Sequence, residues 1–97
     1  MRESAFQRKC IERARKAGLL AVNNHGSGWS NKGYPDLTLF GRGKCVQVEL
    51  KSDSGYKVQE DQIVWRNRFE RHGIPHRVIE DGNLDAFDAM IREEFGS

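Results

Sequence analysis

The chain has 97 residues, a formal net charge of +2 at pH 7 and two cysteines, Cys10 and Cys45. This length predicts a single domain over residues 1–97 with one modest hydrophobic core, and no apolar run reaches the roughly 20 residues that cross a membrane. Because no secretory signal is evident and the cysteines lack metal-binding spacing, we expect free thiols and a cytoplasmic protein.

The first third of the chain predicts a helix, a short strand and a long loop. Residues 3–17 place apolar side chains at helical spacing, and Gly18 suits the position that ends a helix. Residues 19–22 form an apolar stretch of strand length, and residues 23–34 are polar and glycine-rich, which is typical of a loop. Basic residues crowd the start of the chain: Arg2, Arg8, Lys9, Arg13, Arg15 and Lys16.

The middle of the chain predicts a β-hairpin that gathers charged residues. Strands over 37–40 and 45–51 flank a tight turn, so the start of the first strand meets the end of the second. Asp36 precedes the first strand, and Glu49 and Lys51 share one face of the second because side chains alternate along a strand. We therefore expect two carboxylates and one ammonium at the same end of the sheet.

Such a cluster suits a divalent cation, a water molecule and a phosphate. Mg²⁺ binds through only one or two acids and keeps several waters, and as a Lewis acid it lowers the pKa of a coordinated water. The lysine can hold that water or stabilise charge on the phosphate. The simpler alternatives are that Asp36 terminates the turn after Pro35 and that Glu49 and Lys51 form a solvated strand face.

The second half of the chain completes an α/β pattern. Residues 58–72 predict an amphipathic helix with Trp65 and Phe69 toward the core, residues 76–80 a strand, and residues 84–94 a final helix. The order is therefore α-β-β-β-α-β-α. A strand, a crossover helix and another strand predict a parallel pair within a mixed sheet that is flanked by helices.

Together these stretches resemble the virus-type replication-repair nuclease (VRR-NUC) domain of the PD-(D/E)xK nuclease superfamily, which implies a restriction-endonuclease-like core. The nuclease motif itself is degenerate, and the glutamine-bearing helix and the N-terminal glutamate make the joint match more specific. The resemblance covers nearly the whole chain. The matching stretches are Glu3-Ser4 with Gln7, 24–28, 33–37, 48–51, Gly55, Gln62 with Trp65, Phe69 with Gly73, and 75–79.

The resemblance implies a role for each residue of the motif. Asp36 and Glu49 would bind Mg²⁺ or Mn²⁺, with the carbonyl oxygen of Leu50 as a further ligand. Lys51 would position or activate the attacking water. These four residues would form the catalytic and metal-binding centre.

Two further residues would complete the site, and each has an alternative in the sequence. Gln62 would orient the nucleophile or the lysine; Gln59 is the alternative, although Trp65 three residues after Gln62 favours Gln62. Glu3 would complete the acidic cluster directly or through a water. Glu12 is its alternative, but it lies nine residues further along the same helix.

Residues in two polar loops are candidates for contacts with DNA phosphates. His25 and Ser27 lie in the glycine-rich loop, and Lys32 and Lys57 are loop cations; solvated surface is the alternative for each. Residues 41–44 lack the spacing of a phosphate-binding loop and its following serine or threonine, so we expect no nucleotide cofactor.

The resemblance, together with a basic N-terminal element beside an acidic site, predicts a Mg²⁺-dependent DNA endonuclease selective for branched or Holliday-junction DNA. It also implies a homodimer that places two active sites on opposing strands. We expect a DNA-associated, cytoplasmic protein with a role in DNA repair and a phage origin. The alternatives are a less selective duplex nickase or endonuclease and a nuclease-like DNA-binding module without catalysis.

Overall fold

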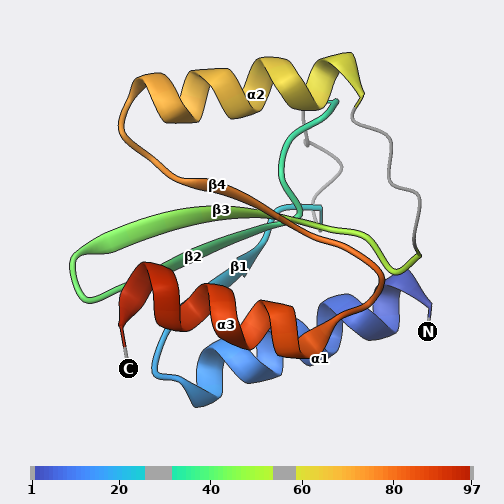
Figure 1. The fold of residues 1–97 in the computed structure, drawn as a ribbon, viewed down its shortest axis with the longest axis vertical. Coiled ribbons are helices and arrows are strands. Elements are labelled where there is room, and N and C mark those ends of the chain that lie inside the picture. Colours follow the sequence, from blue (N-terminus) through green and yellow to red (C-terminus); the bar gives the residue numbers. More distant parts are fainter. Residues whose placement is uncertain (1, 26–31, 54–58, 97) are drawn as a thin grey trace.

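Helices and strands follow one another in the predicted order in the computed structural model, which describes residues 2–25, 32–53 and 59–96. Element boundaries agree with the sequence-based prediction to within two residues, and no helix in the described ranges is long and apolar enough to cross a bilayer. The elements are α1 (Glu3–Lys16), β1 (Leu20–Asn23), β2 (Leu37–Gly41), β3 (Lys44–Leu50), α2 (Glu60–Arg71), β4 (His76–Ile79) and α3 (Leu84–Phe95) (Figure 1).

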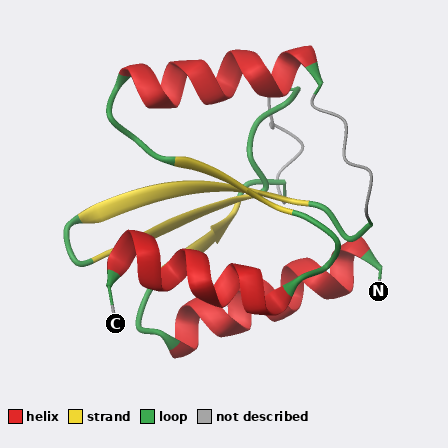
Figure 2. Ribbon diagram, in the orientation of Figure 1, coloured by secondary structure: helices red, strands yellow, loops and turns green. Residues whose placement is uncertain are grey.

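The described strands form one mixed sheet in the order β1-β2-β3-β4. The first three strands pair antiparallel, and β4 pairs parallel to β3 after the α2 crossover. Helices α1 and α3 lie together on one face of the sheet, and α2 lies on the other (Figure 2). The predicted mixed sheet flanked by helices is therefore confirmed.

The hydrophobic core lies between the sheet and the pair α1 and α3. Alternate residues of β3, namely Val46, Val48 and Leu50, point into it, as the two-residue period of a strand requires. Phe6 of α1 and Phe87 of α3 are fully buried, and burial of a side chain this large stabilises the fold by roughly 1.5–3 kcal/mol. Because α1 is anchored here, its first turn is fixed beside the sheet.

Helix α2 is attached differently from what the sequence predicts. Among the residues of α2, all of which the structure describes, Gln62 alone is buried. Trp65 and Phe69 are half-buried and stay outside the core, so their predicted core position is wrong. Both rings instead pack edge-on against Tyr34, with ring centroids 4.8 and 5.6 Å from it. This aromatic cluster holds α2 to the loop that precedes β2.

The sheet face beneath α2 is polar, which explains why the aromatic residues of α2 find partners elsewhere. The hydroxyl of Thr38 donates to Gln47 Oε1 at 2.7 Å, and Asn24 Nδ2 donates to Thr38 Oγ1 at 2.9 Å. The same Asn24 amide donates to the carbonyl oxygen of Pro35 at 3.1 Å, and its backbone N–H donates to the carbonyl oxygen of Asp36 at 2.9 Å. This network fixes the chain on which Asp36 is carried.

Candidate active site

The β2–β3 hairpin places Asp36 beside the end of β3. Leu37 pairs with Val48, so the residues one step outward, Asp36 and Glu49, lie at the same end of the sheet. The backbone N–H of Leu50 donates to Asp36 Oδ2 at 2.7 Å, which holds the aspartate against the last residue of the strand. A carboxylate from each side of the hairpin thus reaches one location.

Glu49 is the most perturbed acid of this cluster. Glu49 is only 3% exposed, and Gln62 Nε2 donates a hydrogen bond to Glu49 Oε2 at 2.7 Å. Burial, followed by the side-chain hydrogen bond with Asp36 and the charge of Asp36, raises the pKa of Glu49 from 4.5 to about 9. Lys51 acts in the opposite direction, and Glu3 adds a smaller increase. Two neighbouring carboxyl groups therefore share a poorly solvated space.

An open cavity of about 420 Å³ connects these groups. Its walls come from the first turn of α1, the loops on either side of residues 26–31, the hairpin and the first turn of α2. The cavity is lined by Glu3, Ser4, Gln7, His25, Gly33, Tyr34, Asp36, Glu49, Lys51 and Gln62.

The structure separates the alternatives that the sequence left open. Gln62 and Glu3 line the cavity, whereas Gln59 and Glu12, which the structure also describes, lie outside it. Gln59 instead caps α2, and its backbone N–H donates to Gln62 Oε1 at 3.2 Å. The Gln62 amide thus bridges the start of α2 to Glu49. Its two ends are held by different elements, which fixes its orientation.

Lys51 directly follows β3 and is anchored through its backbone. Its N–H donates to the carbonyl oxygen of Ile79 at 2.9 Å, and its own carbonyl oxygen accepts from the N–H of Gly82 at 3.0 Å. The side chain lines the cavity with that of Glu49, two residues earlier. The backbone that carries the Lys51 side chain is therefore held in place by hydrogen bonds.

His25 lies closer to the acidic cluster than the sequence suggests. Its Nε2 is 2.8 Å from Asp36 Oδ1, although the side chain is 37% exposed. The backbone N–H of His25 donates to Asn23 Oδ1 at 3.0 Å, and Asn24 is tied to Pro35 and Asp36. These side-chain bonds within a loop give no periodic signal, so sequence patterns could not place the imidazole.

Of the other three candidates for DNA contact, only Lys32 is among the described residues. Lys32 lies against α2, where its Nζ is 3.4 Å from Asp61 Oδ2 and its carbonyl oxygen accepts from Trp65 Nε1 at 3.2 Å. Ser27 and Lys57 lie outside the described residues. Phosphate contact by these residues and by His25 stays a prediction.

No family model matches this sequence, and no curated protein matches it. Solved structures do match. A structure of a VRR_NUC domain is 28% identical, superposes with a TM-score of 0.75, and the match covers 93% of this chain and 94% of that one. This match in sequence and fold supports the assignment of the chain as a VRR-NUC domain.

Two other solved structures share the fold of this chain. A VRR_NUC domain protein is 16% identical with a TM-score of 0.73, and the match covers 97% of this chain and 88% of that one. Hjc of Archaeoglobus fulgidus, a Holliday junction resolvase, is 24% identical with a TM-score of 0.61 over 78% of this chain and 64% of the Hjc chain. The predicted restriction-endonuclease-like fold is thus confirmed.

The donor atoms in the cavity around Asp36 and Glu49 fit a hard divalent cation. The described residues contain no group of three or more His, Cys, Asp or Glu arranged to hold a metal, but Mg²⁺ needs only one or two carboxylates and prefers oxygen ligands. Asp36 and Glu49 supply these, and a cation would offset both the burial of the Glu49 carboxylate and its repulsion by Asp36, which together raise its pKa. His25 lies at Asp36 Oδ1 and the N–H of Leu50 at Oδ2, and a carboxylate oxygen has a second lone pair that a cation can use.

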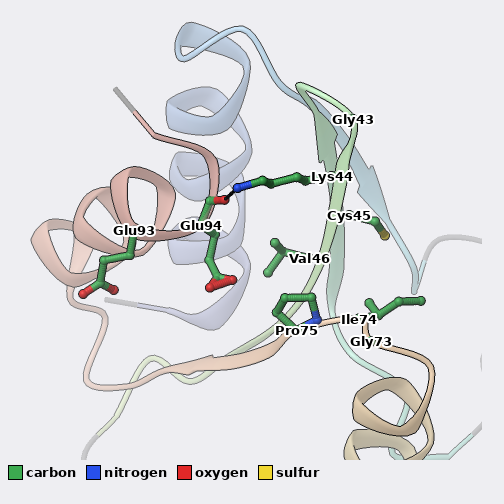
Figure 3. A pocket seen from close by; sticks show the side chains of 9 residues that line it. All are labelled: Gly43, Lys44, Cys45, Val46, Gly73, Ile74, Pro75, Glu93 and Glu94. Carbon is green, nitrogen blue, oxygen red and sulfur yellow. Dashed lines mark hydrogen bonds between the residues drawn. The ribbon is translucent and has the colours of Figure 1, made fainter.

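A second cavity, of about 440 Å³, lies at the opposite end of β3 from the acidic cluster (Figure 3). Lys44 Nζ donates there to the carbonyl oxygen of Glu94 at 3.1 Å. Glu93 and Glu94 both pair with Arg77, at 2.6 and 3.4 Å. Because these charged side chains already have partners, the described residues of this cavity offer no set of groups poised for catalysis.

Gly33 fixes the approach of the loop to α2, and its replacement by alanine should be strongly destabilising. Its φ of +82° disfavours a side chain, and a Cβ would lie 2.5 Å from the backbone carbon of Asp61. We expect Gly33→Ala to lower the free energy of unfolding in urea by about 2 kcal/mol or more.

Gly43→Ala is the matched control for that substitution. Gly43 has a φ of +75°, but nothing lies within 4 Å of an added Cβ. It should therefore show the backbone cost alone, roughly 1 kcal/mol. Equal losses for the two variants would contradict a tight contact between Gly33 and α2.

Proposed function

We propose that this chain is a VRR-NUC-like, Mg²⁺-dependent endonuclease that hydrolyses phosphodiester bonds in branched DNA, with Holliday junctions as the favoured substrate. The observation that carries the proposal is the convergence of Asp36, Glu49, Lys51 and Gln62 on one open cavity. The likeness to a VRR_NUC domain structure supports the nuclease chemistry, and the shared fold with the resolvase Hjc supports a branched substrate.

Asp36, Glu49 and the carbonyl oxygen of Leu50 would hold Mg²⁺ or Mn²⁺. When bound, the cation supplies Lewis-acid polarisation of the phosphate and lowers the pKa of a coordinated water. Glu3, at the first turn of α1, adds negative charge to the same cavity, directly or through a water. The N–H of Leu50 holds Asp36 in place from its Oδ2 side.

Lys51 and Gln62 would organise the reacting groups. The Lys51 ammonium favours the ionised form of Glu49, as its effect on the pKa of that carboxyl shows, and it can stabilise charge that develops on the phosphate. Gln62 donates to Glu49 while its own oxygen is held by Gln59. Such outer contacts fix the orientation of a metal-binding carboxylate.

Substrate choice is tested by cleavage of a labelled four-way junction and of a linear duplex with the same sequence, each with Mg²⁺, Mn²⁺ or EDTA. The proposal predicts metal-dependent cutting confined to the junction. Cutting of both substrates would favour the less selective duplex endonuclease. Binding of the junction without cutting would favour a DNA-binding module and would overturn the catalytic proposal.

We also propose that the protein forms a homodimer through exposed apolar residues of β1 and β2. Leu20, Phe40 and Val22 are 61%, 41% and 39% exposed. Leu20 and Phe40 are cross-strand partners, and Cys45 is the partner of Phe40 on the other side, so these side chains share one face. An uncharged apolar patch can face its own copy across a two-fold axis without like-charge repulsion. We call Leu20, Val22, Phe40 and Cys45 the sheet patch.

Phe40→Glu is expected to convert the dimer into a monomer, because two buried carboxylates would face each other across the axis. Sedimentation velocity measures the change in mass. Val64→Glu is the matched control, since Val64 is 46% exposed on α2 and lies outside the sheet patch. A dimer that survives Phe40→Glu would contradict this interface. The cytoplasmic location, the role in DNA repair and the phage origin stay predictions.

A further inference from the structure

A groove of about 490 Å³ runs between α1 and the end of β1, the edge strand of the sheet. It is continuous with the catalytic cavity, because Ser4 and Gln7 line both. From there it follows α1 past Arg8 to Arg15, with Asn23 of β1 on its other side. We call this the α1 groove.

Gln7 stands where the α1 groove meets the catalytic cavity. Its Nε2 is buried and has no hydrogen-bond partner among the described residues. An unpartnered buried donor costs roughly 1–3 kcal/mol, so its presence at the junction of two open spaces indicates an acceptor that arrives with a ligand. The amide can donate to a phosphate oxygen but cannot compete with the carboxylates for a cation.

Arg8 and Arg15 line the α1 groove further from the catalytic cavity than Gln7. Both side chains are exposed, and neither forms an ion pair with a residue that the structure describes. Arg13, on another side of the helix, is instead paired with Asp88. Seven residues of helix separate Arg8 from Arg15 by roughly 10 Å along the axis, about the rise of three nucleotides in one DNA strand.

We propose that the α1 groove binds the phosphate backbone of the DNA strand that leads away from the cleavage site. Gln7 donates to the phosphate at the mouth of the catalytic cavity, and Arg8 and Arg15 neutralise the phosphates that follow. Among the described residues that line the groove, Arg8 and Arg15 carry positive charge and Glu12 carries negative charge, so the net charge of the groove is positive. The inference rests on the proposed nuclease function, since it assigns the path of that enzyme's substrate.

The arginines are tested by salt dependence in a Lys51→Met background with Mg²⁺ present, where cleavage is slow enough for binding to be measured before the DNA is cut. The Arg8→Gln/Arg15→Gln pair should lower the slope of log affinity against log salt for a labelled four-way junction by about 1.4–1.8. Lys9→Gln/Lys16→Gln is the matched control: it removes the same charge at the same spacing on α1, outside the groove. Equal changes in slope for the two pairs would overturn the inference.

Gln7 is tested in the active chain by Gln7→Met, which keeps the length of the side chain and removes the donor. We expect KM for the junction to rise about tenfold, with kcat and the Mg²⁺ concentration at half-maximal activity unchanged. The free energy of unfolding should not fall, because the lost group has no partner in the described fold. An unchanged KM, or a loss of stability that accounts for the rise, would overturn the role of Gln7.

The two levels of the proposal fail differently. A wild-type chain that cuts no DNA refutes the nuclease function and the strand path with it. A wild-type chain that cuts the junction, beside Arg8→Gln/Arg15→Gln and Gln7→Met variants that bind and cut as it does, refutes the strand path alone.

Discussion

Replacing Lys51 by methionine should slow cleavage of junction DNA by about 10²–10³-fold, because it removes the cation beside Glu49 that can stabilise charge on the phosphate. Methionine keeps most of the length and apolar stem of the side chain. Single-turnover cleavage with Mg²⁺ measures the effect on the chemical step.

Folding should survive this substitution, which makes the loss interpretable. The contacts of Lys51 with Ile79 and Gly82 are made by its backbone and are retained in the variant. Lys44→Met is the matched control, because Lys44 is an exposed lysine at the opposite end of the same strand and lines a different cavity. Wild-type cleavage by Lys51→Met would remove Lys51 from the mechanism.

Glu49→Gln should abolish metal-dependent cleavage. In the absence of metal, the variant should become increasingly more stable than the wild type as the pH rises. The folded pKa of Glu49 is about 9, above the ordinary value of 4.5. Between these values the folded state holds a proton that the unfolded state has released, so stability falls with increasing pH by up to about 1.4 kcal/mol per pH unit. The carboxamide does not titrate and can still accept the hydrogen bond from Gln62.

The measurement is urea unfolding of the Glu49→Gln variant and the wild type in EDTA between pH 5 and pH 7. The difference in free energy of unfolding should shift by about 3 kcal/mol in favour of the variant over that range. Taking the difference removes other titrating groups, such as His76, whose pKa burial lowers. A difference that does not change with pH would show that Glu49 is ionised and solvated in the folded protein.

The features that the sequence predicts correctly are those with a local period or a short connection. The order of elements follows from helical and strand spacing, and the tight turn of the hairpin is enough to bring Asp36 to the end of the strand that carries Glu49. The parallel pairing of β3 and β4 follows from the length of the α2 crossover between them.

The features that sequence patterns could not decide depend on contacts between distant segments. Sequence spacing favours Gln62 over Gln59 only weakly, whereas the structure gives Gln62 a bond to Glu49 and makes Gln59 a cap. Trp65 and Phe69 have the spacing of core residues but pack outside the core. Periodicity records that a face is apolar and says nothing about which surface covers it.

The most direct test of the central claim is the chemistry of cleavage by the wild-type chain. A four-way junction labelled on each strand is incubated with Mg²⁺ or with EDTA, and the ends of the products are determined by mass spectrometry. We expect 5′-phosphate and 3′-hydroxyl ends with Mg²⁺ and intact strands with EDTA, as in-line attack by a metal-activated water requires. Cleavage that persists in EDTA, or DNA that stays intact with Mg²⁺, would contradict a metal-dependent nuclease site at Asp36, Glu49 and Lys51.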